Sequence, residues 1–89
     1  MEDFKGTKGY WSYRKETGTI RGDSGLLAEV LINGSEDHNG TLMAAAPELL
    51  EALQLTEKAM AEGRNVTYPE WYGVISKARA AIHKALGKE

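Results

Sequence analysis

The stretch SEDHNGTLMAAAPELLEAL, residues 35–53, decides the fold. Its apolar residues recur every three or four positions, at Leu42, Met43, Ala46, Leu49, Leu50 and Leu53. This spacing places one apolar stripe along one face of a helix. Pro47 interrupts the stripe, because proline removes a backbone hydrogen bond and clashes with the preceding turn. We therefore predict a short helix over 37–46, capped by Ser35 or Asp37, and a longer helix over 47–62 that begins at Pro47.

Three short segments that precede this stretch predict a small β-sheet. Residues 10–14, 19–21 and 26–32 are aromatic or β-branched in character, and turn-forming residues separate them. The turns are too short for parallel crossovers, so the pattern predicts an antiparallel meander. The third segment is the most apolar, and we expect it to be buried on both faces or to be the central strand. Residues 1–9 are polar and glycine-containing, which predicts a flexible N-terminal arm.

A second long helix is predicted near the C-terminus. Thr67 and Glu70 have the spacing of a capping box, and Pro69 suits a first helical turn. The helix should run over 68–86 and end at Gly87, with its apolar face at Trp71, Val74, Ile75, Ala78, Ile82 and Leu86. The two long helices should pair antiparallel, with the sheet as the second layer. The prediction is one α+β domain over 10–89, with the sheet at 10–32 and helices at 37–62 and 68–86.

Composition restricts the classes of function. The chain has 89 residues, 42% of them hydrophobic, a net charge of −2 and no cysteine. The negative charge disfavours general DNA binding, and the absence of cysteine excludes disulfides and thiolate metal sites. No apolar run is long enough to span a membrane. A core this small favours self-association into a dimer or higher oligomer.

No catalytic or metal-binding motif stands out. The two histidines, His38 and His83, fall in different predicted helices and have no further ligands at metal-binding spacing. The serines have no hydrolase motif around them. We therefore predict a protein that is not an enzyme and that needs no cofactor or metal.

The segment that begins at Asn39 carries a resemblance. Asn39, the pair Leu42–Met43 and the run AAAPELLEAL, residues 44–53, resemble a segment found in small bacteriophage and prophage accessory proteins. The layout of a small sheet followed by such helices is similar to the Thoeris anti-defence 1 family, phage sponges that sequester cyclic nucleotide signals. The resemblance implies a phage protein in the host cytoplasm. It also implies a ligand of the cyclic nucleotide or cyclic ADP-ribose type, and a contact from Asn39.

Six residues form the predicted ligand site. Trp11 and Tyr13 share one sheet face and can stack on bases, while Arg14 and Arg21 can hold phosphate. Asn39 lies in a first helical turn, where free N–H groups favour an anion, and Met43 follows it on the same helix. Two interpretations remain open, since the aromatic residues can equally be core and Asn39 a capping residue.

A second surface is predicted on the last helix. Tyr72 lies off the main apolar stripe, and with Arg79 it belongs to a mixed group of aromatic and basic residues that includes Arg64. Such a group suits a protein contact, or else an ordinary solvated helix face. The sequence thus supports non-catalytic sequestration of a cyclic nucleotide first. The alternative is an inhibitor or adaptor that docks on a host defence enzyme, and a small structural or regulatory phage protein is a third possibility.

Overall fold

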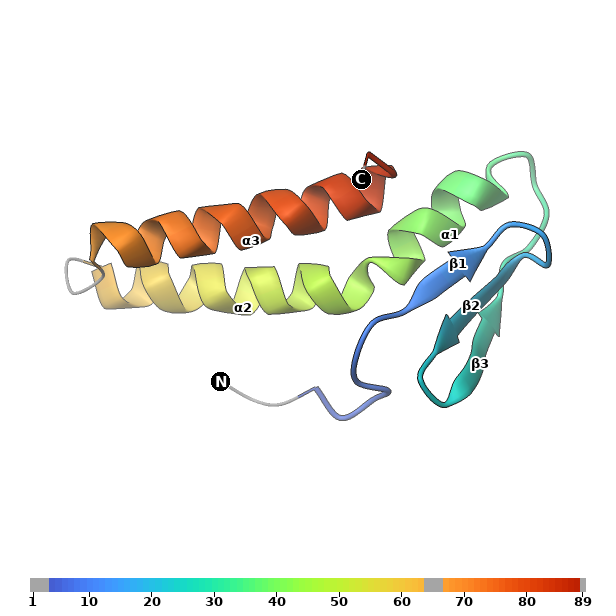
Figure 1. The fold of residues 1–89 in the computed structure, drawn as a ribbon, viewed down its shortest axis with the longest axis horizontal. Helices are drawn as coiled ribbons and strands as arrows, with labels where there is room; N and C mark the ends of the chain where they lie inside the picture. The colour runs from blue at the N-terminus through green and yellow to red at the C-terminus, as the bar shows by residue number, and fades with distance from the viewer. Residues whose placement is uncertain (1–3, 64–66, 89) are drawn as a thin grey trace.

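The computed structural model describes residues 4–63 and 67–88. Three strands precede three helices along the chain (Figure 1). Their bounds are β1 (Ser12–Arg14), β2 (Thr19–Gly22), β3 (Gly25–Glu29), α1 (Glu36–Ala44), α2 (Ala46–Glu62) and α3 (Tyr68–Leu86). The predicted α+β class, with a meander followed by a broken helix and an antiparallel helix, is confirmed.

The sheet is antiparallel in the order β1-β2-β3, so β2 is its central strand. The expectation that the third strand is central or buried on both faces is therefore wrong. β3 is an edge strand that ends at Glu29, and Leu26 within it is 54% exposed. Leu31 and Ile32 lie beyond the strand, where the chain has already turned toward α1, and both are exposed. The apolar run is thus longer than the strand, and its end reaches the surface.

The strands pack against α1. Tyr13 on β1 pairs with Ile20 on β2, and Ile20 is buried with Val30 and Ala44 of α1. Gly40 of α1 is buried directly against the ring of Tyr13. The sheet was expected to cover the two long helices, and this is wrong, because among the described elements the strands contact α1 and neither α2 nor α3. Figure 1 shows the sheet at one end of a long helical hairpin.

The break predicted at Pro47 is confirmed. α1 ends at Ala44, and the N–H of Ala45 donates to the carbonyl of Leu42 at 3.1 Å. α2 starts at Ala46 with Pro47 in its first turn, where the missing N–H of proline costs little.

The predicted cap of α1 is wrong. Ser35 occupies the N-cap position, but its side chain makes no capping bond. Instead, the Glu36 carboxylate accepts from the backbone N–H groups of Asn33 and Gly34 at 3.0 and 2.8 Å. The carboxylate of Asp37 accepts from Tyr13 rather than from its own helix.

Alanines form the seam between α2 and α3. Ala52, Ala59 and Ala81 are buried to between 2% and 7% exposure. The predicted apolar faces form the core only in part, since Leu53 is 68% exposed and Ile82 is 49% exposed, while Val74 and Ala78 are half-buried. Small side chains let the helices approach closely, so the longer side chains that flank the seam lie outside it.

The ends of α3 are as predicted. Thr67 and Glu70 form a reciprocal capping box, in which the Thr67 hydroxyl accepts from the N–H of Glu70 and the Glu70 carboxylate accepts from the N–H of Thr67. Gly87 ends the helix with φ of 74°, a left-handed conformation that glycine adopts without steric cost.

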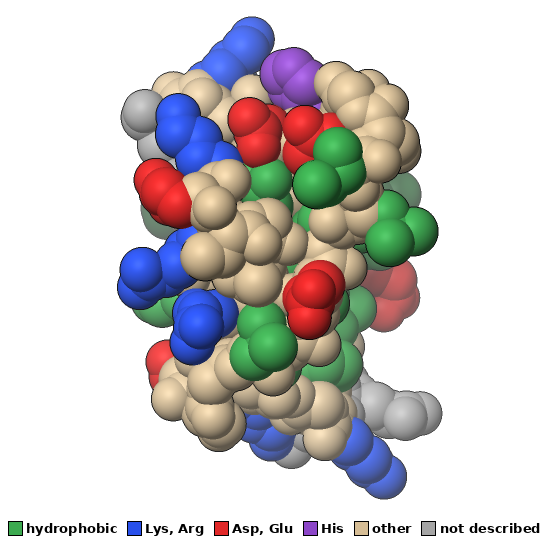
Figure 2. Space-filling model, turned by 90° about the vertical axis from the view of Figure 1, so that its right-hand side faces the viewer, with side chains coloured by type: hydrophobic (Ala, Val, Ile, Leu, Met, Phe, Trp, Pro, Cys, Tyr) green, Lys and Arg blue, Asp and Glu red, His purple; other side chains and the backbone are tan. Residues whose placement is uncertain are grey.

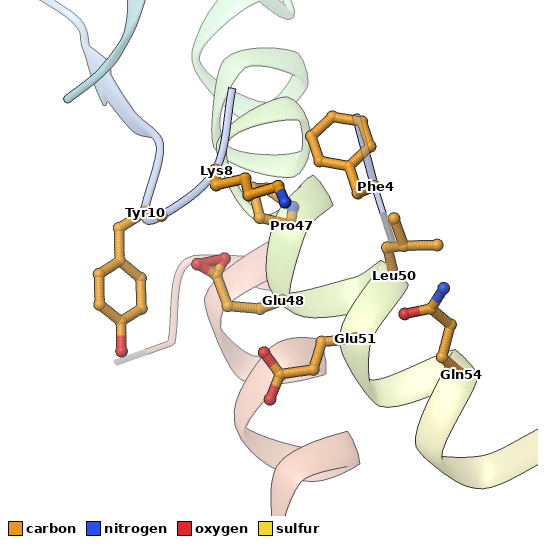
Figure 3. Close-up of a pocket in the computed structure, with 9 residues that line it drawn as sticks. Phe4, Lys8, Tyr10, Pro47, Glu48, Leu50, Glu51 and Gln54 are labelled. Atoms are coloured by element: carbon orange, nitrogen blue, oxygen red, sulfur yellow. The ribbon is translucent and has the colours of Figure 1, made fainter. Parts of the chain in front are cut away.

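One side of the hairpin carries ion pairs and the N-terminal segment. Lys77 pairs with Glu51 and Lys84 with Glu48, each at 2.7 Å. Lys84 also donates to the carbonyl of Trp11 and lies 5.3 Å from the ring centre of Tyr10. Figure 3 shows residues of this segment beside the first turns of α2. Flexibility of residues 1–9 stays a prediction, and residues 1–3 lie outside the described part.

Candidate functional site

A shallow groove of about 790 Å³ lies where β1, the start of α1 and the end of α3 meet. It is lined by residues of β1 and the turn after it, of the first half of α1 and of the C-terminal end of α3. The lining residues are Tyr13, Arg14, Lys15, Glu16, Asp37, His38, Asn39, Thr41, Leu42, Ala85, Leu86 and Gly87.

Tyr13 fixes the geometry of this groove. Its hydroxyl donates to a carboxylate oxygen of Asp37 at 2.7 Å, which joins β1 to the first turn of α1. This hydrogen bond, with burial and the nearby negative charges, raises the pKa of Tyr13 to about 12. The phenol therefore stays protonated at neutral pH and remains a donor.

The groove brings together half of the predicted ligand residues. Tyr13 and Arg14 come from β1, and Asn39 comes from α1, more than twenty positions later in the sequence. Asn39 is half-buried and Arg14 is exposed. The ligand site itself stays a prediction, but these three residues line the same groove.

The other three predicted residues lie elsewhere. Trp11 packs on the core beside Ile20, and its indole N–H donates to the carbonyl of Thr7 at 3.0 Å, so it serves the fold. Arg21 on β2 pairs with Ser12 and does not line the groove. Met43 is 47% exposed and does not line the groove.

Sequence reasoning missed two basic residues of the groove. Lys15 lies in the turn after β1 and His38 lies beside Asn39, so both line the groove. In the sequence, the only indication of their role is that each stands next to a predicted ligand residue. Glu16 and Asp37 also line the groove, so its charge is mixed. The described residues contain no cluster of histidine and acidic side chains that could hold a metal ion.

The predicted protein-contact residues lie on α3, away from the groove. Tyr72 is 57% exposed, and its hydroxyl accepts from Tyr68 at 3.2 Å. This bond raises the pKa of Tyr68. Arg79 is exposed two helical turns further on, while Arg64 of the same predicted group lies outside the described residues.

Hydrophobic side chains also reach the surface at the sheet end of the molecule, among acidic and basic ones (Figure 2). Leu26, Leu31 and Ile32 are the strongly exposed aliphatic residues of β3 and the loop after it. None of the described helices is long and apolar enough to cross a membrane.

The comparisons with curated proteins and with solved structures gave no significant match. The resemblance to the Thoeris anti-defence 1 family thus stays a prediction, whereas phage origin has direct support. The family model described as Salmonella phage P22 protein Y8K6 matches residues 1–89, and the chain therefore belongs to this phage protein family.

Proposed function

We propose that this chain is a non-catalytic phage anti-defence protein that binds a cyclic nucleotide signal and so sequesters it. One observation supports this function most directly. Tyr13, Arg14 and Asn39 were selected from the sequence for nucleotide chemistry, and they line one groove although they come from two separate elements. The layout of a small sheet followed by helices, which is similar to that of the sponge family, suggests the class of ligand.

The groove offers separate places for the parts of such a ligand. Arg14 can hold a phosphate through paired N–H groups, and Lys15 adds a second positive charge. The amide of Asn39 can donate and accept, which suits the edge of a base. Leu42 and Leu86 offer an apolar wall for the face of a base or a ribose.

A thermal-shift screen tests this function. The purified chain is heated with cyclic dinucleotides, cyclic trinucleotides or cyclic ADP-ribose isomers, each at about a hundredfold over the expected Kd, where binding stabilises by about 2.7 kcal/mol. A sponge should show a clear rise in Tm and should release the ligand chemically intact after denaturation. A modified ligand would indicate catalysis instead.

Two arginine variants give a matched control. Arg14→Ala should weaken binding with a marked dependence on salt, because Arg14 lines the groove. Arg21→Ala removes the same charge at a position that does not line the groove, and it should bind as the wild type does. Asn39→Ala should weaken binding while the unfolding midpoint stays close to that of the wild type. Equal losses in both arginine variants would place the ligand elsewhere.

A second candidate function is inhibition of a host defence protein through α3. Tyr72 and Arg79 support it, since both are exposed on one helix beside apolar side chains. An inhibitor of this kind should co-purify with one host protein and show no nucleotide-induced shift. Tyr72→Ala and Arg79→Ala should each release that protein.

A further inference from the structure

Each of the two long helices carries a second stripe in addition to its alanine seam. In both helices this stripe has alternating spacings of four and three, the spacing of a coiled-coil face. On α2 it comprises positions 46, 49, 53, 56 and 60, and on α3 positions 68, 72, 75, 79, 82 and 86.

The two stripes lie on the same side of the hairpin. Glu51 precedes the seam residue Ala52, and Lys77 precedes Ala78, so their ion pair marks one side. On each helix, the residue before a seam residue and the residue after it lie about 100° to either side of it. Leu53 and Arg79 therefore face the side opposite the ion pair. We call this side of α2 and α3 the apolar face.

The apolar face is open in the single chain. Leu53 and Met60 on α2 are each 68% exposed, and Ile75 and Ile82 on α3 are 41% and 49% exposed. Leu53 and Met60, with Thr56 and Glu57, also border a shallow hollow of about 510 Å³ that could receive side chains. No strand covers this side, because the described strands contact only α1 among the helices.

The polar residues of the apolar face are compatible with a second copy. The Thr56 hydroxyl already donates to the carbonyl of Ala52 at 2.7 Å and needs no partner from outside. Arg79 makes no ion pair within the described ranges, and the same holds for Glu57 at the edge of the α2 stripe. Each copy thus offers one acid and one base that remain available for the other.

The dimensions of the chain agree with a missing partner. A folded monomer of 9.8 kDa should expose about 5,200 Å², whereas this chain exposes 6752 Å². The excess, about 1,600 Å², is twice the roughly 800 Å² per partner that a stable interface buries. The radius of gyration is 15.0 Å, against about 12 Å for a compact domain of this length. The open hairpin and the segment before β1 both contribute to this excess.

We propose that a second copy of this chain covers the apolar face, so that two α2–α3 hairpins form a four-helix bundle around a twofold axis. The stripes of both helices then supply the bundle core, which the alanine seams alone are too small to provide. Arg79 within the α3 stripe can then pair with Glu57 at the edge of the other copy's α2 stripe. The predicted contact surface at Tyr72 and Arg79 is then a contact with the same protein. This inference does not depend on nucleotide binding.

Light scattering on the full chain at micromolar concentration tests the proposal. The wild type should have twice the monomer mass and should dissociate on dilution. Leu53→Glu should shift it to the monomer, because the charge would be buried in the bundle. Leu26→Glu is the matched control, since Leu26 is 54% exposed on β3, and it should remain dimeric. Circular dichroism of each variant verifies that the helices are retained.

A second measurement needs no disruptive substitution. The chain has no cysteine, so Met60→Cys and Leu31→Cys each introduce one thiol at an exposed position. The thiol at position 60 should react slowly with a maleimide at high protein concentration and faster on dilution, while that at position 31 should react quickly throughout.

Three results would overturn the proposal. A wild type that stays monomeric, together with a freely reactive thiol in Met60→Cys, leaves the apolar face without a second copy. A dimer lost in Leu26→Glu but kept in Leu53→Glu forms through the sheet edge instead. A monomer that captures a host protein, and loses it in Leu53→Glu, assigns the face to that host protein.

Discussion

Gly40 is the position where a single methyl group should test the packing of the sheet on α1. A Cβ at residue 40 would overlap the ring of Tyr13, with the ring Cγ only 2.7 Å away. The ring cannot move easily, because its hydroxyl is bonded to Asp37 and its strand is paired with β2. Gly40→Ala must therefore push β1 away from α1 or break the bond to Asp37.

The size of the effect follows from two opposing terms. Alanine is favoured over glycine inside a helix by about 1 kcal/mol. Overpacking a buried contact costs about 1–3 kcal/mol, and the rigid ring puts Gly40→Ala in the upper part of this range. The expected net loss is about 1–2 kcal/mol. Gly73 on α3 gives the matched control, because its added Cβ meets nothing within 4 Å. Gly73→Ala should therefore gain up to about 1 kcal/mol.

Urea denaturation of both variants, at one protein concentration, measures these changes. The same Gly→Ala substitution should shift the midpoint in opposite directions at the two sites. In a Tyr13→Ala background the cost of Gly40→Ala should disappear, since the overlapping ring is gone. If Gly40→Ala stabilises the wild type as much as Gly73→Ala does, Tyr13 does not pack on α1 and the described groove does not exist.

Three further predictions concern the helices and the pH dependence. Thr67→Ala should destabilise the chain by about 1 kcal/mol in urea denaturation, because it removes the cap of α3, and an unchanged midpoint would argue against the capping box. Ala81→Leu should cost about 1–3 kcal/mol by overpacking the seam beside Ala52, whereas a stabilised variant would mean that the seam has room. The pKa of Tyr13 is raised from 10.0 to about 12, so its bond to Asp37 should stabilise the fold fully below pH 10 and be lost as pH rises toward 12. Ultraviolet titration should therefore show one late-ionising tyrosine that disappears in Tyr13→Phe, and its persistence would contradict the assignment.

Local signals in the sequence predicted the elements well. Pro47 located the break between the helices, and the Thr67–Glu70 spacing located the start of α3, because each of these acts within one or two turns of its own position. The cap of α1 was missed since Tyr13, more than twenty residues away, occupies the Asp37 carboxylate. Local patterns cannot report such a distant contact.

The choice of buried face was the larger error. Periodicity identifies an apolar stripe but does not say which of two adjacent stripes faces the neighbouring helix. The leucine and isoleucine stripe was the stronger signal because its side chains are larger, and it was therefore predicted to be the core. In the structure the weaker alanine stripe at Ala52 and Ala59 forms the seam of the single chain. If two copies associate, the stronger stripe is core after all, in the dimer.

Only half of the predicted ligand residues line one groove, and the reason is comparable. Alternation along β1 placed Trp11 and Tyr13 on one face, which is the face that packs on α1. The aromatic residues that were predicted to stack on bases therefore pack against the core instead, at least in part. Asn39 and Arg14 reach the same groove because the sheet lies at the N-terminal end of α1, an arrangement that no local pattern encodes.

The groove and the apolar face meet at Leu86, which lines the groove and also belongs to the α3 stripe. A second copy on the apolar face would therefore approach one end of the groove. Ligand binding and dimer formation should then be coupled, and by linkage each must strengthen or weaken the other by the same factor. The dimer dissociation constant, measured by light scattering with and without a confirmed ligand, tests this coupling. An unchanged constant would mean that one chain holds the ligand alone, so the groove would be complete without its partner.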